Sequence, residues 1–297
     1  MNIFNKVIII FIPFLPKWIV KVIANKYIAG TTIKDAVLVI KHLNNRGESA
    51  TLDILGEHTK NKNECIDISN KYVEILNQID KNNLDCNISV KPSHIGSDID
   101  NKFLGDNFRK IQKHAFNLNN FIRIDMEDSS LTELTLSLCD KLYNKNTNIG
   151  TVIQAYLHRS ESDINLLRKN INIRLCKGIY NEDDTIAFKN PEEINDNYIK
   201  LLETAFKKNI YVGIATHDKT LIKRCLNLIK NKNISNKDFE FQYLYGVPME
   251  DMISIYKKNN YKIRAYVPFG INWYDYSVRR IKENPKIATY VIKNLFK

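Results

Sequence analysis

The sequence predicts an α/β protein that folds as one (β/α)8, TIM-like barrel with extra helices at its N-terminus. Three observations predict this class. The chain has 297 residues, and one closed α/β barrel typically needs about 250. Short apolar segments alternate with longer amphipathic segments, which is the pattern of repeated βα units. No Gly-x-Gly-x-x-Gly sequence occurs, which disfavours an open dinucleotide-binding sheet.

The predicted strands are short segments rich in Ile, Val, Leu, Phe and Tyr. Such composition is typical of parallel strands that are buried on both faces. Eight segments qualify: Ala50–Leu55, Asn87–Lys91, Phe121–Asp125, Thr151–Leu157, Asn172–Leu175, Tyr211–Thr216, Phe239–Leu244 and Lys262–Val267. Eight βα units in one chain favour a closed barrel over an open sheet.

Helix-start patterns lie between these segments. Ser130 and Glu133 form a capping-box pattern that opens a helix. Asn190 and Pro191 are typical of an N-cap followed by a first-turn proline. Another helix is expected after Asp218. The apolar faces that follow these starts are Leu134, Leu138 and Leu142; Ile194, Tyr198, Leu201, Leu202 and Ala205; and Leu221, Ile222, Cys225, Leu228 and Ile229.

Two parts of the chain are expected: an N-terminal helical segment over residues 1–44, packed on the barrel, and the barrel itself over 45–297. Val7–Leu15 is apolar, but Pro13 interrupts it and it is too short to span a bilayer. Packing on the barrel is favoured over a helix that lies on a membrane.

The net charge is +11 and the chain contains five cysteines. A basic chain can bind nucleic acid or an anionic membrane, but here the lysines are dispersed, so solvated helix faces are favoured and no nucleic-acid partner is expected. The cysteines show no Cys-x-x-Cys or Cys/His spacing, so we expect reduced thiols and no metal site.

Polar side chains follow almost every predicted strand. Lys91, Asp125, Arg174 and His217 are chief among them. In an α/β barrel these strand ends form the active-site face. Several unpaired buried charges there would cost several kcal/mol each. We therefore expect the charges to pair with one another or to bind a ligand.

The last predicted helix carries Tyr276, Arg279 and Arg280. Tyr276 lies three and four residues before the arginines, so it is their neighbour on the helix surface. An aromatic ring beside two guanidinium groups suits a small carboxylate with an apolar body. A basic, solvent-exposed helix face explains the same residues equally well.

Taken together, these residues resemble the proline dehydrogenase family. The matching segments follow the family order and cover most of the chain: Asp53–Glu57, Phe121–Glu127, Val152–Leu157, Ile173–Gly178, Ala215–His217, Tyr266–Pro268 and Trp273–Arg280. The most specific is Tyr-x-x-Arg-Arg at 276–280, followed by Glu283.

The resemblance implies FAD-dependent oxidation of L-proline to 1-pyrroline-5-carboxylate, the first step of proline catabolism to glutamate, with electrons passed to a quinone. It implies catalytic roles for Asp125 and for Arg174, near flavin N5. It implies substrate-binding roles for Lys91, Leu244, Tyr266, Tyr276, Arg279 and Arg280, and a gate formed by Glu57 with Arg279. FAD contacts are implied for Met126, Gln154, Lys177, Gly178, Ile179, Thr216, His217 and Glu283.

The chain departs from the family at Ile179, where a small residue is usual, and at Asp218, where Asn is common. The resemblance further implies a monofunctional, cytoplasmic enzyme, either free or peripheral at the inner membrane, with transient contact to a separate pyrroline-5-carboxylate dehydrogenase. Two alternatives stand beside this reading. One is another barrel enzyme, a Schiff-base aldolase using Lys91 or a phosphate-binding lyase. The other is a basic, non-enzymatic binder.

Overall fold

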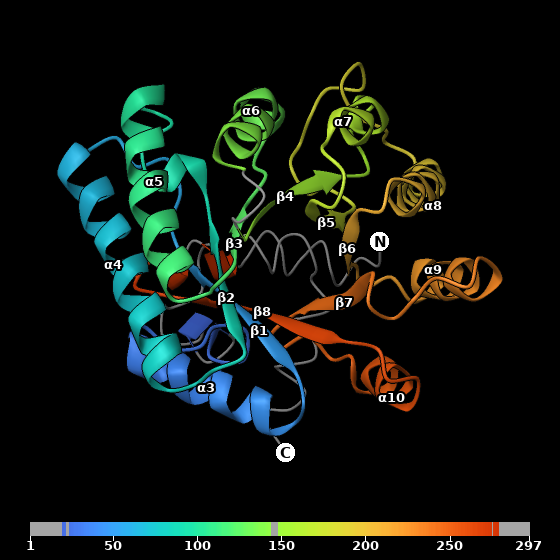
Figure 1. Ribbon diagram of the computed structural model, residues 1–297, viewed down its shortest axis with the longest axis horizontal. Coiled ribbons are helices and arrows are strands. Elements are labelled where there is room, and N and C mark those ends of the chain that lie inside the picture. Colours follow the sequence, from blue (N-terminus) through green and yellow to red (C-terminus); the bar gives the residue numbers. More distant parts are fainter. Residues whose placement is uncertain (1–19, 22–23, 144–147, 275, 279–297) are drawn as a thin grey trace.

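The computed structural model describes residues 20–21, 24–143, 148–274 and 276–278. Its centre is a closed barrel of parallel strands in which each strand pairs with the next and β8 pairs with β1 (Figure 1). The strands are β1 (Ser49–Ile54), β2 (Cys86–Val90), β3 (Ile122–Ile124), β4 (Ile149–Gln154), β5 (Asn172–Cys176), β6 (Tyr211–Ala215), β7 (Phe239–Leu244) and β8 (Ile263–Phe269). The predicted (β/α)8 barrel is confirmed.

All eight predicted strands exist, and most of their residues are buried because helices cover the outer face while side chains fill the interior. The bounds of β7 match the prediction, and those of the other strands differ by at most three residues. β3 is shorter than expected, because Phe121 and Asp125 lie just outside it. β4 begins at Ile149 and ends at Gln154, so the expected segment was placed too far along the chain.

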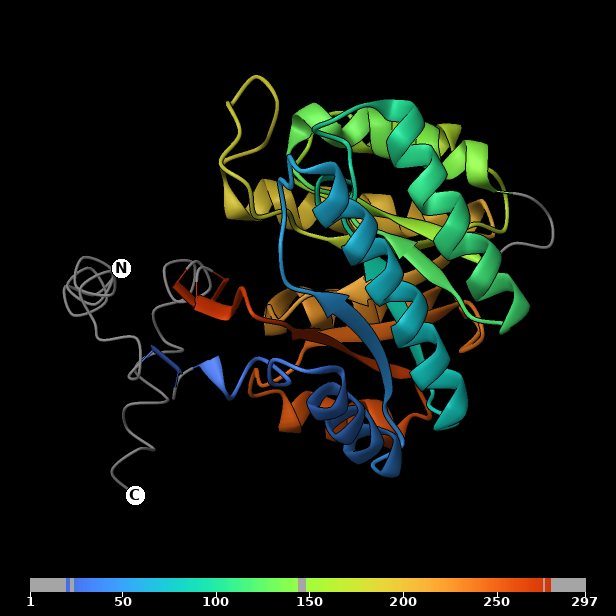
Figure 2. The ribbon, with the colours of Figure 1, turned by 90° about the vertical axis from the view of Figure 1, so that its left-hand side faces the viewer.

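A helix ring surrounds the strands, and Figure 2 shows α4 and α5 along the outside of the barrel. The helices are α3 (Ile33–Asn45), α4 (Lys62–Lys81), α5 (Asn101–Asn117), α6 (Thr132–Leu142), α7 (Ser160–Leu166), α8 (Pro191–Lys207), α9 (Lys219–Asn231) and α10 (Glu250–Lys258). The predicted starts of α8 and α9 are confirmed, since Asn190 and Asp218 cap them with side-chain oxygens.

The capping box predicted at Ser130 and Glu133 is wrong. Asp128 accepts from the Ser130 amide and opens a short 3-10 turn over Ser129–Leu131. α6 then starts at Thr132, one residue later than a cap at Ser130 predicts, and has no side-chain cap. The Glu133 carboxylate contacts Arg159 at 2.6 Å instead. Local competition for the same backbone donors decided the outcome.

The expected helix before the first strand is α3. Its side chains Ala36, Ile40 and Leu43 are buried in the main core, and the helix contacts β1 and β8. Val7–Leu15 lies outside the described residues. Among the helices that the structure describes, none has the length and apolarity needed to cross a bilayer.

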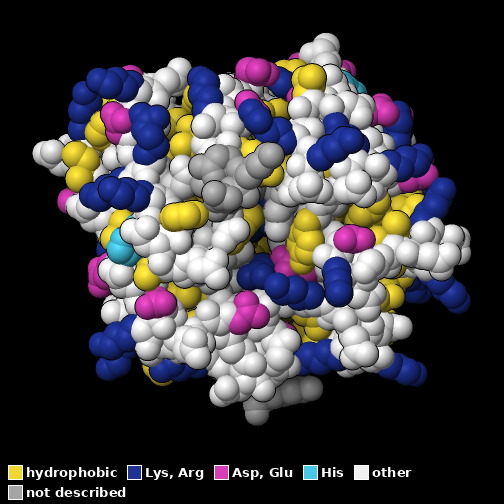
Figure 3. Space-filling model, in the orientation of Figure 1, with side chains coloured by type: hydrophobic (Ala, Val, Ile, Leu, Met, Phe, Trp, Pro, Cys, Tyr) yellow, Lys and Arg dark blue, Asp and Glu magenta, His cyan; other side chains and the backbone are white. Residues whose placement is uncertain are grey.

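The cysteines are free thiols, as expected; Cys176 is half-buried and the other four are buried. In the described part of the chain, no cluster of His, Cys, Asp and Glu could hold a metal ion. On the face seen in Figure 3, basic and acidic side chains are interspersed. That distribution fits the expectation of solvated helix faces.

Candidate active site

A cavity of about 360 Å³ opens at the carboxyl ends of the strands. Its walls come from strands and from the loops that follow them, which is where barrel enzymes hold their active sites. Residues expected at the site that line it are Lys91, Asp125, Met126, Gln154, Arg174, Lys177, Gly178, Ile179, Thr216, His217, Leu244, Tyr266 and Tyr276. The closed barrel therefore brings together residues from seven different strand ends and Tyr276, which lies in helical residues after β8.

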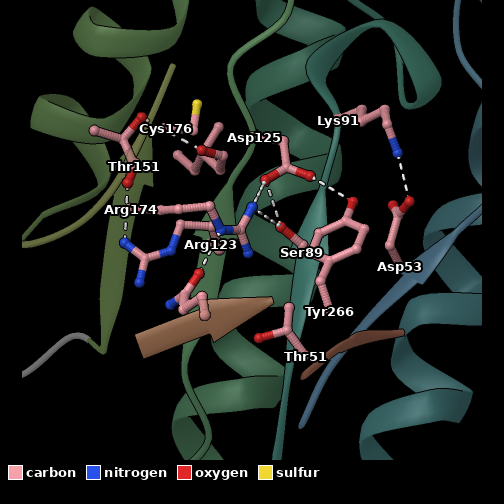
Figure 4. A network of polar contacts seen from close by, with 12 residues as sticks. Thr51, Asp53, Ser89, Lys91, Arg123, Asp125, Thr151, Arg174, Cys176 and Tyr266 are labelled. Atoms are coloured by element: carbon pink, nitrogen blue, oxygen red, sulfur yellow. Dashed lines mark hydrogen bonds and ion pairs between the residues drawn. The ribbon is translucent and has the colours of Figure 1, made fainter. Parts of the chain in front are cut away.

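Asp125 is the centre of the polar network (Figure 4). One carboxylate oxygen accepts from Arg174 Nη1 at 2.6 Å and from Ser89 Oγ at 2.5 Å, and the other accepts from the Tyr266 hydroxyl at 3.0 Å. These donors come from β2, β5 and β8, of which only β2 is adjacent to β3, so the contacts converge across the barrel interior. A buried carboxylate with three donors is held in one orientation.

The charge state of this network follows from its geometry. Burial alone would raise the pKa of Asp125, but the cations Arg174 and Lys91, together with the hydroxyls of Ser89 and Tyr266, hold that pKa below its ordinary value. Burial, with Asp125 next in effect, raises the pKa of Tyr266 well above its usual range. Asp125 is thus ionised and Tyr266 is a neutral donor.

Lys91 lies on one side of the cavity, where its Nζ atom is 2.6 Å from Asp53 Oδ2. Burial would lower the pKa of Lys91, but the carboxylates of Asp53 and Asp125 outweigh it and raise that pKa. Lys91 is therefore a fixed ammonium group. Such a group attracts an anionic ligand, but it is a poor nucleophile for Schiff-base chemistry.

Arg174 is held on three sides. Beyond its pair with Asp125, its Nε atom donates to Gln242 Oε1 at 2.8 Å. Its guanidinium carbon lies 4.8 Å from the centre of the Tyr266 ring. The side chain is buried, so these contacts act where water does not screen them.

The part of the cavity after β5 and β6 carries several of the residues expected to contact a cofactor. Lys177 Nζ pairs with Asp218 Oδ2 at 2.7 Å, and the Leu244 amide donates to His217 Nε2 at 2.9 Å. Gly178 has a φ of +107°, and a Cβ atom there would lie 2.1 Å from the Tyr156 ring. Glycine is favoured here because it adopts this positive φ and lets the backbone run this close to the Tyr156 ring.

Arg279, Arg280 and Glu283 lie outside the described residues. Glu57 is half-buried in the loop after β1 and is not among the cavity-lining residues. Hydrogen bonds to the segment after β2 hold that loop. The His58 amide donates to Ser93 Oγ at 3.0 Å, and the Ser93 amide donates to the Glu127 carboxylate. The gate between Glu57 and Arg279 stays a prediction.

Sequence reasoning gave no role to several polar residues that the structure brings to the site, among them Asp53, Ser89, Tyr180 and Gln242. Asp53 and Gln242 are polar residues near the carboxyl ends of buried strands, so their positions in the sequence could have indicated the site. Ser89 resembles an ordinary strand serine, so only the pairing of strands reveals its contact with Asp125. Tyr180 follows directly after the assigned Ile179.

A closed parallel barrel whose strand ends enclose paired charges in a cavity defines a barrel enzyme. Within that class, the family model for proline dehydrogenase matches residues 36–292. The chain therefore belongs to the proline dehydrogenase family, as the resemblance implied.

Similar proteins agree with this assignment. The chain is 35% identical to "Proline dehydrogenase 1" of Bacillus subtilis subsp. natto, over 92% of this chain and 91% of that protein. It is 31% identical to a proline dehydrogenase of Deinococcus radiodurans, over 93% and 90%. Proline utilization A from Bdellovibrio bacteriovorus, inactivated by N-propargylglycine, superposes with a TM-score of 0.81 at 26% identity; the match covers 88% of this chain and 33% of that longer protein.

Proposed function

We propose that the protein oxidises L-proline to 1-pyrroline-5-carboxylate with bound FAD and passes the electrons to a quinone. The observation that carries the proposal is the Asp125–Arg174–Tyr266 network in a cavity flanked by Lys91. This arrangement offers cationic groups for a carboxylate, ring surfaces for an apolar body and an oriented guanidinium group beside a cofactor wall.

The residues of the cofactor wall fit a flavin. Arg174, Lys177, Thr216 and His217 line one cavity and provide the donors and acceptors that ring carbonyls and nitrogens need. Gly178 adds backbone to the lining of the same cavity. When bound, the flavin supplies the hydride acceptor for the reaction. Met126, Gln154, Ile179 and Glu283 complete the proposed cofactor contacts.

Arg174 and Asp125 supply the electrostatic part of the proposal. The Arg174 guanidinium group, fixed near flavin N5, would stabilise negative charge that develops on the cofactor. Asp125 keeps that group in place. Because the group is already oriented before the reaction, no reorganisation is needed at the moment of hydride transfer.

On the substrate side, Lys91, Arg279 and Arg280 would bind the proline carboxylate, and Leu244, Tyr266 and Tyr276 would enclose the ring. Glu57 would close the pocket through Arg279. Hydride transfer needs an unprotonated ring nitrogen. The cationic charges of Lys91 and Arg174 disfavour a protonated amine beside them, which helps the nitrogen lose its proton. Fixing the carboxylate positions the ring, which contributes much of the rate.

The competing interpretations explain less. A Schiff-base aldolase needs a lysine that loses its proton, whereas the Asp53 carboxylate stabilises the charged form of Lys91. A non-enzymatic basic binder gives no role to the oriented network around Asp125. Location in the cytoplasm, peripheral contact with the inner membrane and transient contact with a pyrroline-5-carboxylate dehydrogenase belong to the same proposal.

The test uses the purified protein with a dye acceptor. L-Proline should reduce the dye and give a product two hydrogen atoms lighter, while D-proline and pyrrolidine should be poor substrates. Pyrrolidine keeps the ring and lacks the carboxylate, so it isolates the contribution of the cationic groups. Equal rates with pyrrolidine and L-proline, or no reaction with L-proline by protein that contains flavin, would contradict the proposal.

A further inference from the structure

Beneath the cavity, a chain of hydrogen bonds crosses the barrel interior from β8 to β5. Arg264 Nε donates to Glu240 Oε1 at 2.8 Å, and Gln242 Nε2 donates to the same oxygen at 2.7 Å. Arg174 Nε then donates to Gln242 Oε1 at 2.8 Å. All four side chains are buried. In the described part of the chain, Gln242 thus links the deep Arg264–Glu240 pair to Arg174 at the cavity.

The orientation of the Gln242 amide is fixed by what lies below it. Burial would raise the pKa of Glu240, but Arg264, with Lys262 and Gln242, holds that pKa at about 2. An ionised carboxylate only accepts hydrogen bonds, so the amide nitrogen must face Glu240. The amide oxygen must then face Arg174. A flipped amide would set its NH2 group against the Arg174 Nε–H group.

A glycine in β6 makes room for this side chain. Gly213 is buried in the middle of the strand, where glycine weakens the sheet. A Cβ atom at Gly213 would lie 2.2 Å from Gln242 Nε2 and 2.7 Å from its amide carbon. The same Cβ atom meets nothing but this side chain among its three nearest atoms. The strand therefore accommodates Gln242 in particular.

We propose that Gln242 is a positioning residue that holds the Arg174 guanidinium group in the orientation the reaction needs. Asp125 and Ser89 both contact the Nη1 atom of Arg174, and the Tyr266 ring lies against the guanidinium carbon, so none of these contacts holds the Nε atom. Gln242 supplies the second fixed point at Nε, on the side of the barrel interior. This inference rests on the proposed function for the identity of the cofactor and substrate.

The test replaces the amide without emptying its space. Gln242→Met keeps the volume and removes both hydrogen bonds. Gly213→Ala keeps every hydrogen-bonding group, but its new methyl group pushes the Gln242 amide away. The fold should persist, because the methyl group meets the far end of the flexible Gln242 side chain. Asn107→Leu is the control for losing one buried amide, because the Asn107 amide donates to the Ile95 carbonyl and does not line the cavity.

Both test variants should lose about ten- to a hundredfold in kcat, as expected for a weakened hydrogen bond to a charged group. The KM for L-proline should change little. The midpoint potential of the bound flavin should fall, because a displaced Arg174 stabilises the reduced, anionic form less. Asn107→Leu should lower the melting temperature and leave kcat and the potential unchanged.

Wild-type kcat and potential in either folded test variant would overturn the inference, as would variants that lose only thermal stability, as the control does. Gly213→Ala provides the decision if Gln242→Met does not fold. A wild-type protein that fails to oxidise proline would instead overturn the proposed function. The two failures are therefore distinguishable.

Discussion

Asp125→Asn is the substitution that should damage the site most for the smallest change in shape. The wild-type carboxylate accepts hydrogen bonds from Arg174, Ser89 and Tyr266. An amide offers one acceptor oxygen and one NH2 group. With the amide oxygen toward Arg174 and Ser89, the NH2 group would face the Tyr266 hydroxyl, whose hydrogen bond would have to reverse. Arg174 would also lose its buried counter-charge.

The magnitude follows from burial. Side-chain exposure of Arg174 and Asp125 is 10% and 9%, so solvent screens their pair little. Removing one partner of a buried ion pair costs about 3–5 kcal/mol of unfolding free energy, which lowers the melting temperature by about 6–20 °C at this chain length. Loss of a charge-assisted hydrogen bond to Arg174 should lower kcat/KM for proline by about ten- to a hundredfold.

The assay combines thermal unfolding with steady-state kinetics in a dye-linked reaction. The matched control is Asp163→Asn. Asp163 is also buried and accepts from Arg159 Nε at 3.0 and 2.9 Å, but it does not line the cavity. The control should lose stability and keep its kinetics. An Asp125→Asn enzyme with wild-type kcat/KM would refute the reasoning that Asp125 orients the reacting site.

Three further outcomes are expected. Arg280 lies outside the described residues. Arg280→Lys should raise the KM for proline about ten- to a hundredfold and leave flavin content unchanged, because the charge remains but the guanidinium fork is lost. Unchanged kinetics would contradict the proposal that Arg280 binds the proline carboxylate. Asp218→Asn should keep the cap of α9 and strengthen FAD binding by up to about fivefold, because the Lys177 ammonium group loses a competing carboxylate. Flavin titration of the apoprotein measures this affinity, and weaker binding would show that the Lys177–Asp218 pair itself holds the cofactor. Burial lowers the pKa of His94 from 6.5 to about 3, so the unfolded state binds this proton more readily and stability falls as pH falls below about 7. His94 should account for about 2 kcal/mol of the loss between pH 7 and 5, and His94→Gln should remove that part of the pH dependence in denaturant unfolding; an unaltered dependence would mean that His94 does not titrate as described.

The sequence was sufficient for the strands because strands buried on both faces are short segments rich in apolar and aromatic residues, with few polar residues among them. β1 and β7 illustrate this, since Ala50–Leu55 and Phe239–Leu244 were predicted within one residue of their bounds. Position along the barrel then followed from chain order. The polar residues after each strand could be assigned to one face because the carboxyl ends of parallel strands meet there.

The contacts between strands could not be predicted in the same way. Nothing in the local sequence says that Ser89 on β2 bonds Asp125 after β3, or that Gly213 on β6 leaves space for Gln242 on β7. Both depend on the register of neighbouring strands. The misplaced cap at Ser130 has the opposite cause, since two local patterns competed and Asp128 bonded the backbone first.

The central claim is that proline delivers its electrons to a flavin held at the barrel mouth beside Arg174. The direct measurement is the visible spectrum of the purified protein under anaerobic conditions. The account predicts a yellow protein whose flavin absorbance is lost when L-proline is added, and which releases FAD on denaturation. A folded, flavin-loaded protein whose spectrum does not change with L-proline would contradict the account.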